Sequence, residues 1–171
     1  VFALLALAAL FVSGLFPWRT WPSQLWSRPS PRAVGMTVAT LYPLGFYLLV
    51  RGYELGNGRY PEPGFNFGLA ALGVLVAAAA AGRAQAASTQ RDFMSEVAAG
   101  FGGFALMAIA LGTPLGLAAG VVTLGTAAAL TACIALLPDR VGYPWMIAIA
   151  AAAGLPPGVA FGALILGLDA A

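Results

Sequence analysis

The sequence predicts an all-α membrane protein with about six transmembrane helices, and three observations support this fold class. First, 61% of the residues are hydrophobic and only 8% are charged, whereas charged residues make up about a quarter of a soluble domain. Second, long uncharged runs recur along the chain, and a helix needs about 20 such residues to cross lipid. Third, no segment alternates with the period of two that the strands of a membrane barrel require.

The uncharged runs define the expected spans in order along the chain. The first three have the length of one span each and are Val1–Trp18, Ala33–Val50 and Pro63–Gly82. The next run, Val97–Pro138, is long enough for two spans. We expect Gly112-Thr113-Pro114-Leu115 to divide it, because glycine and proline interrupt helices and favour turns. The last run, Val141–Leu168, supplies the sixth span.

The first span is predicted to be discontinuous at Pro17, shortly before Trp21. Proline removes a backbone donor, and its ring clashes with a carbonyl one turn back. Broken helices at membrane depth are tolerated where protein or a wet cavity surrounds them, and in transporters they mark ion sites. An interfacial aromatic belt formed by Trp18 and Trp21 is the alternative interpretation of this segment.

The last span is predicted to break at Gly154-Leu155-Pro156-Pro157, where two successive prolines remove two donors. The alternative is a simple proline kink that helps packing, because Gly154, Gly158 and Gly162 form a stripe of small residues. A second stripe, formed by Gly112, Gly116 and Gly120, is predicted to line one face and let two helix backbones approach closely.

Arginine positions predict how the spans are oriented. If the spans alternate in direction, six of the eight arginines fall on one side of the membrane, and only Arg51 and Arg59 fall on the other. The positive-inside rule then places the richer side in the cytoplasm, of a bacterial inner membrane, and both chain ends on the outer side. Because the chain starts and stops within or directly after hydrophobic stretches, we expect residues 1–171 to be one transmembrane bundle from the middle of a longer polytopic subunit. The arginines of the cytoplasmic side are Arg19, Arg28, Arg32, Arg83, Arg91 and Arg140.

The composition excludes several kinds of chemistry. The chain contains no His, and all eight of its basic residues are Arg, so the commonest metal ligand, the commonest general base and the Schiff-base nucleophile are missing. The single Cys133 excludes a disulfide framework and a thiolate zinc site. A net charge of +2 is too small for a nucleic-acid interface. The sequence therefore predicts the lipid bilayer as a partner, with no nucleic acid, metal, cofactor or catalytic residue.

Hydroxyl groups are the polar groups left inside the uncharged runs. Thr123, Thr126 and Thr131 of the fifth span, joined by water, form a possible proton path, although none has a pKa near working pH. The alternative, which we favour, is that each hydroxyl bonds a backbone carbonyl one turn back or on a neighbouring helix. Glu96, the acid closest to a span start, is predicted to be there because a carboxylate is favourable near a helix N-terminus. The second span adds Thr37, Thr40 and Tyr42 to the hydroxyl pattern.

Four segments carry short motifs in a fixed order. Residues 15–23 read Leu-Phe-Pro-Trp-Arg-Thr-Trp-Pro-Ser, residues 28–31 read Arg-Pro-Ser-Pro, and residues 45–51 read Gly-Phe-Tyr-Leu-Leu-Val-Arg. Residues 153–161 read Ala-Gly-Leu-Pro-Pro-Gly-Val-Ala-Phe. Together they resemble the antiporter-like membrane subunits of respiratory complex I, membrane-bound hydrogenases and multisubunit cation/proton antiporters. That family has Pro-Phe-His-x-Trp-Leu-Pro, Pro-Thr-Pro-Val, Gly-x-Tyr-x-Leu-x-Arg and Ala-Gly-Leu-Pro-Pro-x-x-Gly-Phe at the corresponding places.

The resemblance implies that the six spans are helices seven to twelve of a fourteen-helix subunit, with the first and last discontinuous. It implies at most a non-catalytic membrane subunit of a translocating oxidoreductase, bound to other membrane subunits. The sequence departs from the family where the family keeps its buried Lys and His relay, because none of the residues found there titrates. Those residues are Val12, Pro43, Thr126, Leu130 and Leu164.

Two functions follow as expectations. The first is an antiporter-like subunit of a proton- or cation-translocating complex, of the NADH:quinone oxidoreductase or hydrogenase type, in which this segment does not itself conduct protons. The second is a non-pumping membrane scaffold subunit of such a complex. An intramembrane hydrolase or lipid-modifying enzyme is a weaker third, because no His or intramembrane acid is present to activate Ser13.

Overall fold

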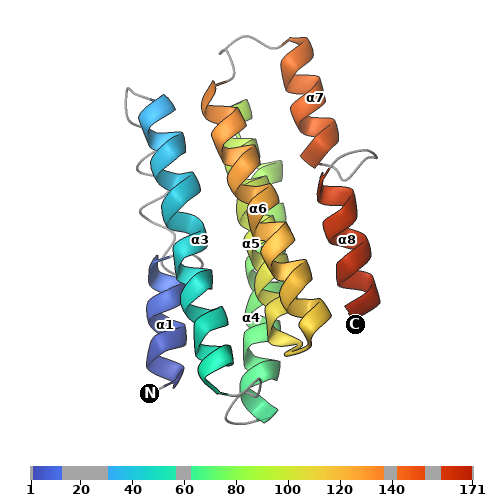
Figure 1. The fold of residues 1–171 in the computed structure, drawn as a ribbon. Coiled ribbons are helices and arrows are strands. Elements are labelled where there is room, and N and C mark those ends of the chain that lie inside the picture. Colours follow the sequence, from blue (N-terminus) through green and yellow to red (C-terminus); the bar gives the residue numbers. More distant parts are fainter. Residues whose placement is uncertain (1, 13–30, 57–62, 137–141, 153–158, 171) are drawn as a thin grey trace.

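The computed structural model describes residues 2–12, 31–56, 63–136, 142–152 and 159–170, and every regular element in these ranges is a helix (Figure 1). The described residues contain no strand, which confirms the all-α prediction for this part of the chain. The helices are α1 (Phe2–Val12), α3 (Pro31–Leu55), α4 (Pro63–Gln85), α5 (Gln90–Ala110), α6 (Pro114–Leu136), α7 (Tyr143–Ala152) and α8 (Val159–Ala170).

Three of these helices are long and apolar enough to cross a membrane. They contain the segments Gly64–Gln85 in α4, Asp92–Ala110 in α5 and Pro114–Cys133 in α6. Such segments indicate an integral membrane protein, because a water-soluble domain rarely contains several helices that are both of bilayer length and strongly apolar. The described residues thus supply three membrane-length helices, and these do not by themselves confirm the predicted number of about six spans.

Helices α3, α4, α5 and α6 run up and down alternately along the bundle (Figure 1). Helix α6 contacts α5, α3 and α8, and makes a smaller contact with α7. Helix α4 packs on α5, and α1 packs on α3. About half of the spanning segments of α5 and α6 are buried, against 22% of that of α4, so α4 lies at the edge of the described bundle.

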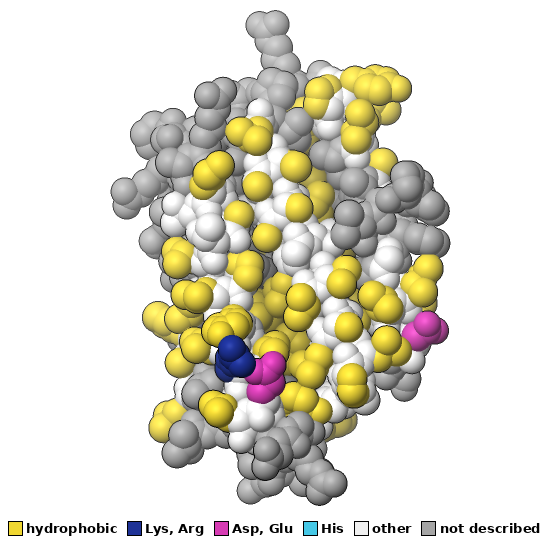
Figure 2. All heavy atoms as spheres, viewed as in Figure 1, with side chains coloured by type: hydrophobic (Ala, Val, Ile, Leu, Met, Phe, Trp, Pro, Cys, Tyr) yellow, Lys and Arg dark blue, Asp and Glu magenta, His cyan; other side chains and the backbone are white. Residues whose placement is uncertain are grey.

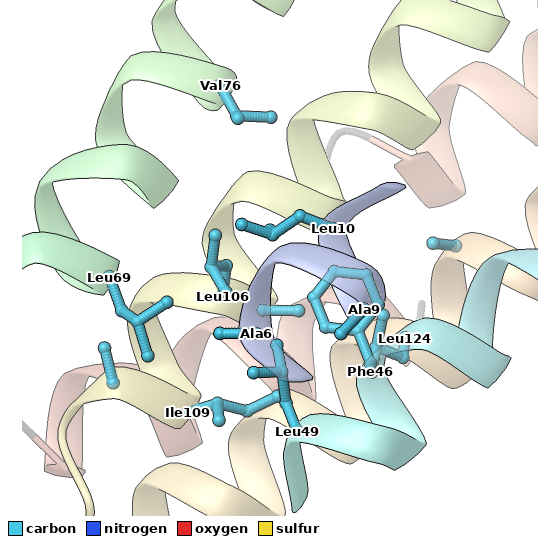
Figure 3. Close-up of a cluster of buried hydrophobic side chains, with 13 residues drawn as sticks. Ala6, Ala9, Leu10, Phe46, Leu49, Leu69, Val76, Leu106, Ile109 and Leu124 are labelled. Carbon is cyan, nitrogen blue, oxygen red and sulfur yellow. The ribbon is translucent and has the colours of Figure 1, made fainter. Parts of the chain in front are cut away.

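The core joins five helices, and α1 contributes two alanines and a leucine to it (Figure 3). Ala6 and Ala9 of α1 lie beside Phe46 of α3 in this cluster. Alanine at these positions lets α1 approach α3 closely, as is usual where helices associate without a hydrophobic driving force. Further members are Leu10, Leu49, Leu69, Val76, Ala105, Leu106, Ile109, Ala110, Leu124 and Ala127.

The predicted division between the fourth and fifth spans is confirmed. Helix α5 ends at Ala110 and α6 begins at Pro114, which suits proline because the first turn of a helix needs no intrahelical donor. Gly112 between them has a φ of 64°, a left-handed conformation that glycine adopts without a Cβ clash. The hydroxyl of Thr113 then accepts a 3.0 Å hydrogen bond from the backbone N–H of Gly116 and caps the new helix.

The stripe of small residues is confirmed at two of its three positions. A Cβ on Gly116 would lie 2.5 Å from the carbonyl oxygen of Ala108, and one on Gly120 would lie 2.6 Å from a side-chain carbon of Ile109. Both glycines therefore let α6 approach α5. The prediction for Gly112 is wrong, because this residue belongs to the turn and not to the packed helix face.

The helix directions place several arginines together. The start of α3, the end of α4 and the start of α5 lie at one end of the bundle, so Arg32, Arg83 and Arg91 share that end (Figure 1). Arg51, in the last part of α3, lies towards the opposite end. This grouping agrees with the alternating directions used to assign the loops, while the side of the membrane that each end faces stays a prediction. Arg19, Arg28 and Arg140 lie outside the described residues.

Candidate functional site

The positions where the resembled family keeps its relay lie on four helices that contact one another in succession. Val12 is the last residue of α1, Pro43 lies within α3, Thr126 and Leu130 lie in α6, and Leu164 lies in α8. Helix α1 contacts α3, α3 contacts α6, and α6 contacts α8 (Figure 1). These positions, called the row below, thus lie on helices that contact one another in turn.

The row is apolar except for one hydroxyl. Thr126 and Leu130 are buried, with 5% and 7% of their surface exposed, while Val12 and Pro43 are half-buried. None of these side chains carries an ionisable group. The four residues therefore lack a group that can hold a proton inside the bundle.

The three threonines of the possible hydroxyl path are all buried in α6. Each donates to the backbone carbonyl four residues earlier: Thr123 to Ala119 at 2.7 Å, Thr126 to Val122 at 2.9 Å and Thr131 to Ala127 at 2.7 Å. This is the local back-bonding that satisfies a hydroxyl inside a membrane helix. The favoured interpretation, a hydroxyl bonded to a carbonyl one turn back, is therefore confirmed for all three threonines. The alternative, a proton path through these hydroxyls and water, is not tested by the structure.

Helix α3 continues through Pro43, which has no N–H to donate to the carbonyl of Ala39. Next to it, the hydroxyl of Thr40 donates to the carbonyls of Met36 and Thr37, both at 3.0 Å. Beside Pro43, a pocket of about 300 Å³ opens between α3 and α6. Its lining is almost entirely apolar and consists of Pro43, Phe46, Tyr47, Val50, Val121, Leu124 and Gly125.

A charged pair lies beside this pocket. Nη1 of Arg51 lies 2.5 Å from a carboxylate oxygen of Glu54, one turn further along α3. Nε of the same guanidinium donates to the hydroxyl of Tyr47 at 2.8 Å, and its Cζ lies 5.4 Å from the centroid of the Tyr47 ring. Since Tyr47 lines the pocket, the pair sits next to the end of an apolar groove.

A second ion pair links two helices. Nε of Arg83, in the last turn of α4, donates to Glu96 of α5 at 3.1 Å. The carboxylate of Glu96 is only 13% exposed, so a favourable position near a helix N-terminus is an incomplete account of this acid. Nη2 of Arg83 is buried and has no hydrogen-bond partner among the described residues. The sequence does contain a signal for this ion pair. The connection between α4 and α5 is short, so the end of α4, with Arg83, lies beside the start of α5, with Glu96.

The turn between α5 and α6 is tied to α3 by a hydrogen bond that sequence reasoning missed. The hydroxyl of Tyr53, near the end of α3, donates to the carbonyl of Gly112 at 2.5 Å. The two residues are 59 positions apart in the chain, so no local sequence pattern predicts this hydrogen bond. The bond satisfies a carbonyl that the left-handed turn leaves outside both helices.

The discontinuous-helix positions Pro17, Trp21, Gly154, Pro156 and Pro157 lie outside the described residues, so the two breaks stay predictions. Among the residues that the structure does describe, no group of three His, Cys, Asp or Glu side chains is placed to hold a metal ion. Cys133 is a free thiol at an exposed position of α6.

The described helices define a helical membrane protein with an apolar interior, a polar turn and charged pairs near the helix ends. Comparison of the chain with protein-family models, curated proteins and solved structures finds no match.

Proposed function

We propose that the chain is an antiporter-like membrane subunit of a proton- or cation-translocating complex of the NADH:quinone oxidoreductase or hydrogenase type. The motif order in the sequence is the first support. The observation that carries the proposal is the row of Val12, Pro43, Thr126 and Leu130 with Leu164, because these positions fall on helices in successive contact. A relay across a membrane subunit needs its positions on helices that adjoin one another, and this helix order meets that requirement.

The proposed subunit crosses the membrane six times here, with a first span broken at Pro17 and a last span broken at Gly154-Leu155-Pro156-Pro157. Three features support this count. Helix α1 has 11 residues, α7 has 10 and α8 has 12, each about half of a span. In Figure 1, α7 lies above α8, and together they extend along the bundle beside α6. Both described ends of the chain lie at the same end of the bundle, as an even number of spans requires (Figure 1).

In this proposal the segment itself does not conduct protons along the row. A relay needs groups that bind and release a proton, and the row offers only apolar side chains and one back-bonded hydroxyl. Transport by the intact protein then uses residues outside this segment. The loops with Arg19, Arg28, Arg32, Arg83, Arg91 and Arg140 face the cytoplasm of a bacterial inner membrane.

A non-pumping scaffold subunit is the second candidate, and one observation favours it. All three buried threonines donate their hydroxyl proton to their own helix, so α6 presents no polar face to a path. A helix that serves only packing has this arrangement. Under this second candidate function, the subunit keeps the helical bundle and the surfaces that bind partner subunits in the resembled family, but it has no path for ions.

Proton flux into vesicles separates the candidates. The intact protein, in its complex, is reconstituted into liposomes that contain a pH-sensitive dye, and the complex is energised. We expect flux that is unchanged by Thr126→Val and Thr131→Val. The matched control is Thr40→Val, an exposed threonine with the same back-bonding geometry. No flux with the assembled complex supports the scaffold, and flux that Thr126→Val blocks while Thr40→Val does not contradicts the non-conducting segment.

A further inference from the structure

The pocket between α3 and α6 has the shape of a groove for one hydrocarbon chain. From Pro43 to Val50 the α3 side of the groove extends seven residues, about 10 Å along the helix. On the α6 side, Gly125 leaves a gap, because a Cβ there would meet no atom within 4 Å. Phe46 and Leu124 are buried and form the floor, while Tyr47 and Val121 are exposed at the rim.

One end of this groove carries both signs of charge. The guanidinium of Arg51 stacks over the Tyr47 ring at the groove and contacts Glu54 on its other side. Both side chains are more than half exposed, at 58% and 52%. An arginine has five N–H donors, and the contacts of Arg51 with described residues use one on Nε and one on Nη1. Figure 2 shows a basic and an acidic side chain next to each other on a face whose coloured side chains are otherwise largely hydrophobic.

We propose that this groove binds a phospholipid with an ethanolamine headgroup, with one acyl chain between α3 and α6, the phosphate on Arg51 and the ammonium on Glu54. A cation and a carboxylate side by side complement a zwitterion that has a phosphate and a primary amine. Arginine binds phosphate oxygens through paired N–H groups, and a carboxylate accepts from an ammonium. The position of the pair, just beyond the uncharged run that ends at Val50, matches the depth of headgroups.

The groove favours a lipid chain over a helix of a partner protein. A helix with its side chains is about 10–12 Å across and packs on a membrane helix through a continuous stripe of small residues. Here Gly125 is the only small residue of the lining, and its neighbours Phe46, Tyr47 and Leu124 are bulky. A narrow volume of about 300 Å³ between such side chains admits a flexible chain and excludes a helical backbone.

Native mass spectrometry of the intact protein tests the proposal. The delipidated protein in a mild detergent is given dioleoyl phosphatidylethanolamine, phosphatidylcholine or phosphatidylglycerol at equal concentrations. We expect phosphatidylethanolamine to bind about tenfold more tightly than phosphatidylcholine, whose quaternary ammonium has no N–H for Glu54. The Glu54→Gln variant is expected to bind the two lipids equally, with its affinity for phosphatidylcholine unchanged.

The Gly125→Leu variant fills the groove and is expected to weaken the binding of all three lipids about tenfold. Gly68→Leu is the matched control, since Gly68 is an exposed glycine of α4 where an added Cβ would meet no atom within 4 Å. Equal binding of the three lipids, a preference for phosphatidylglycerol, or the same result for both glycine variants overturns the proposal. So does a protein cross-link from Gly125→Cys, in a Cys133→Ser background, to a helix of another subunit.

The lipid proposal rests on the membrane location of the groove and not on ion translocation. Its test measures bound lipid, whereas the test of the proposed function measures flux. If the protein binds ethanolamine lipid but its complex conducts no protons, the lipid proposal holds and the ion-translocation proposal fails. If the complex conducts protons but the protein does not prefer ethanolamine lipid, the ion-translocation proposal holds and the lipid proposal fails.

Discussion

Gly73 of α4 and Gly103 of α5 face each other at a close backbone contact between these two helices. A Cβ on Gly73 would lie 2.7 Å from the carbonyl oxygen of Gly103, and a Cβ on Gly103 would lie 2.6 Å from the carbonyl oxygen of Gly73. Neither oxygen is able to move aside, because both belong to helical backbone. These two glycines, far apart in the chain, therefore set how near α4 comes to α5.

Gly103→Ala is expected to destabilise the protein by about 1–3 kcal/mol, the usual cost of forcing extra volume into a packed interface. The added carbon would also lie 2.6 Å from the backbone nitrogen of Ala77, so α4 must shift. Gly68→Ala on α4 is the control, since it meets nothing and gains helix propensity. Denaturant unfolding in detergent micelles, followed by circular dichroism, measures both. Equal midpoints for the two variants would contradict the close contact.

Tyr53→Phe is expected to lower the free energy of unfolding by about 0.5–1.5 kcal/mol, because the carbonyl of Gly112 loses its donor. The side chain is only 8% exposed, so water does not easily replace the hydroxyl. Amide hydrogen exchange should rise in the turn at residues 111–117 and not along α4. Tyr143→Phe, at a 78% exposed tyrosine, is expected to change neither quantity. Unchanged exchange in the turn would show that Tyr53 does not hold it.

The two ion pairs are expected to differ in coupling energy. A double-mutant cycle with Arg83→Gln and Glu96→Gln should give about 0.5–1 kcal/mol, whereas one with Arg51→Gln and Glu54→Gln should give a smaller coupling energy. The reason is exposure: Glu96 is 13% exposed and Glu54 is 52% exposed. Both couplings should shrink as salt is added, and the exposed pair should lose its coupling first. A larger coupling for the exposed pair would reverse this ranking.

Leu130→Lys is expected to lower the yield of correctly folded protein and not to create a proton path. Leu130 is 7% exposed in α6, and a lysine near the centre of a membrane helix costs about 2.5–3.5 kcal/mol on insertion scales. Leu136→Lys, at the 65% exposed end of the same helix, is the control, because its side chain can reach the headgroups. The yield of folded protein after size-exclusion chromatography measures the effect. Val12→Lys is expected to lower the yield as Leu130→Lys does. Equal yields for Leu130→Lys and Leu136→Lys would show that residue 130 is not buried.

The sequence by itself determined the all-α class, the membrane location and the turn between α5 and α6. These depend on local properties: the length of uncharged runs, and the backbone demands of Gly112 and Pro114. The close approach at Gly116 and Gly120 was also predictable, since small residues four apart have few other uses in a lipid-embedded helix. The prediction for Gly112 was wrong because spacing alone does not distinguish a glycine within a turn from the first glycine of a packed helix face.

Only the tertiary structure decided which helix faces meet. In water, an apolar stripe marks the buried side of a helix, but in lipid both the core and the outer surface are apolar, so the pattern carries no direction. The facing pair Gly73 and Gly103, the link from Arg83 to Glu96, and the groove beside Tyr47 all follow from how whole helices cross. Such crossings depend on contacts between residues far apart in the chain, and no local run of residues encodes them.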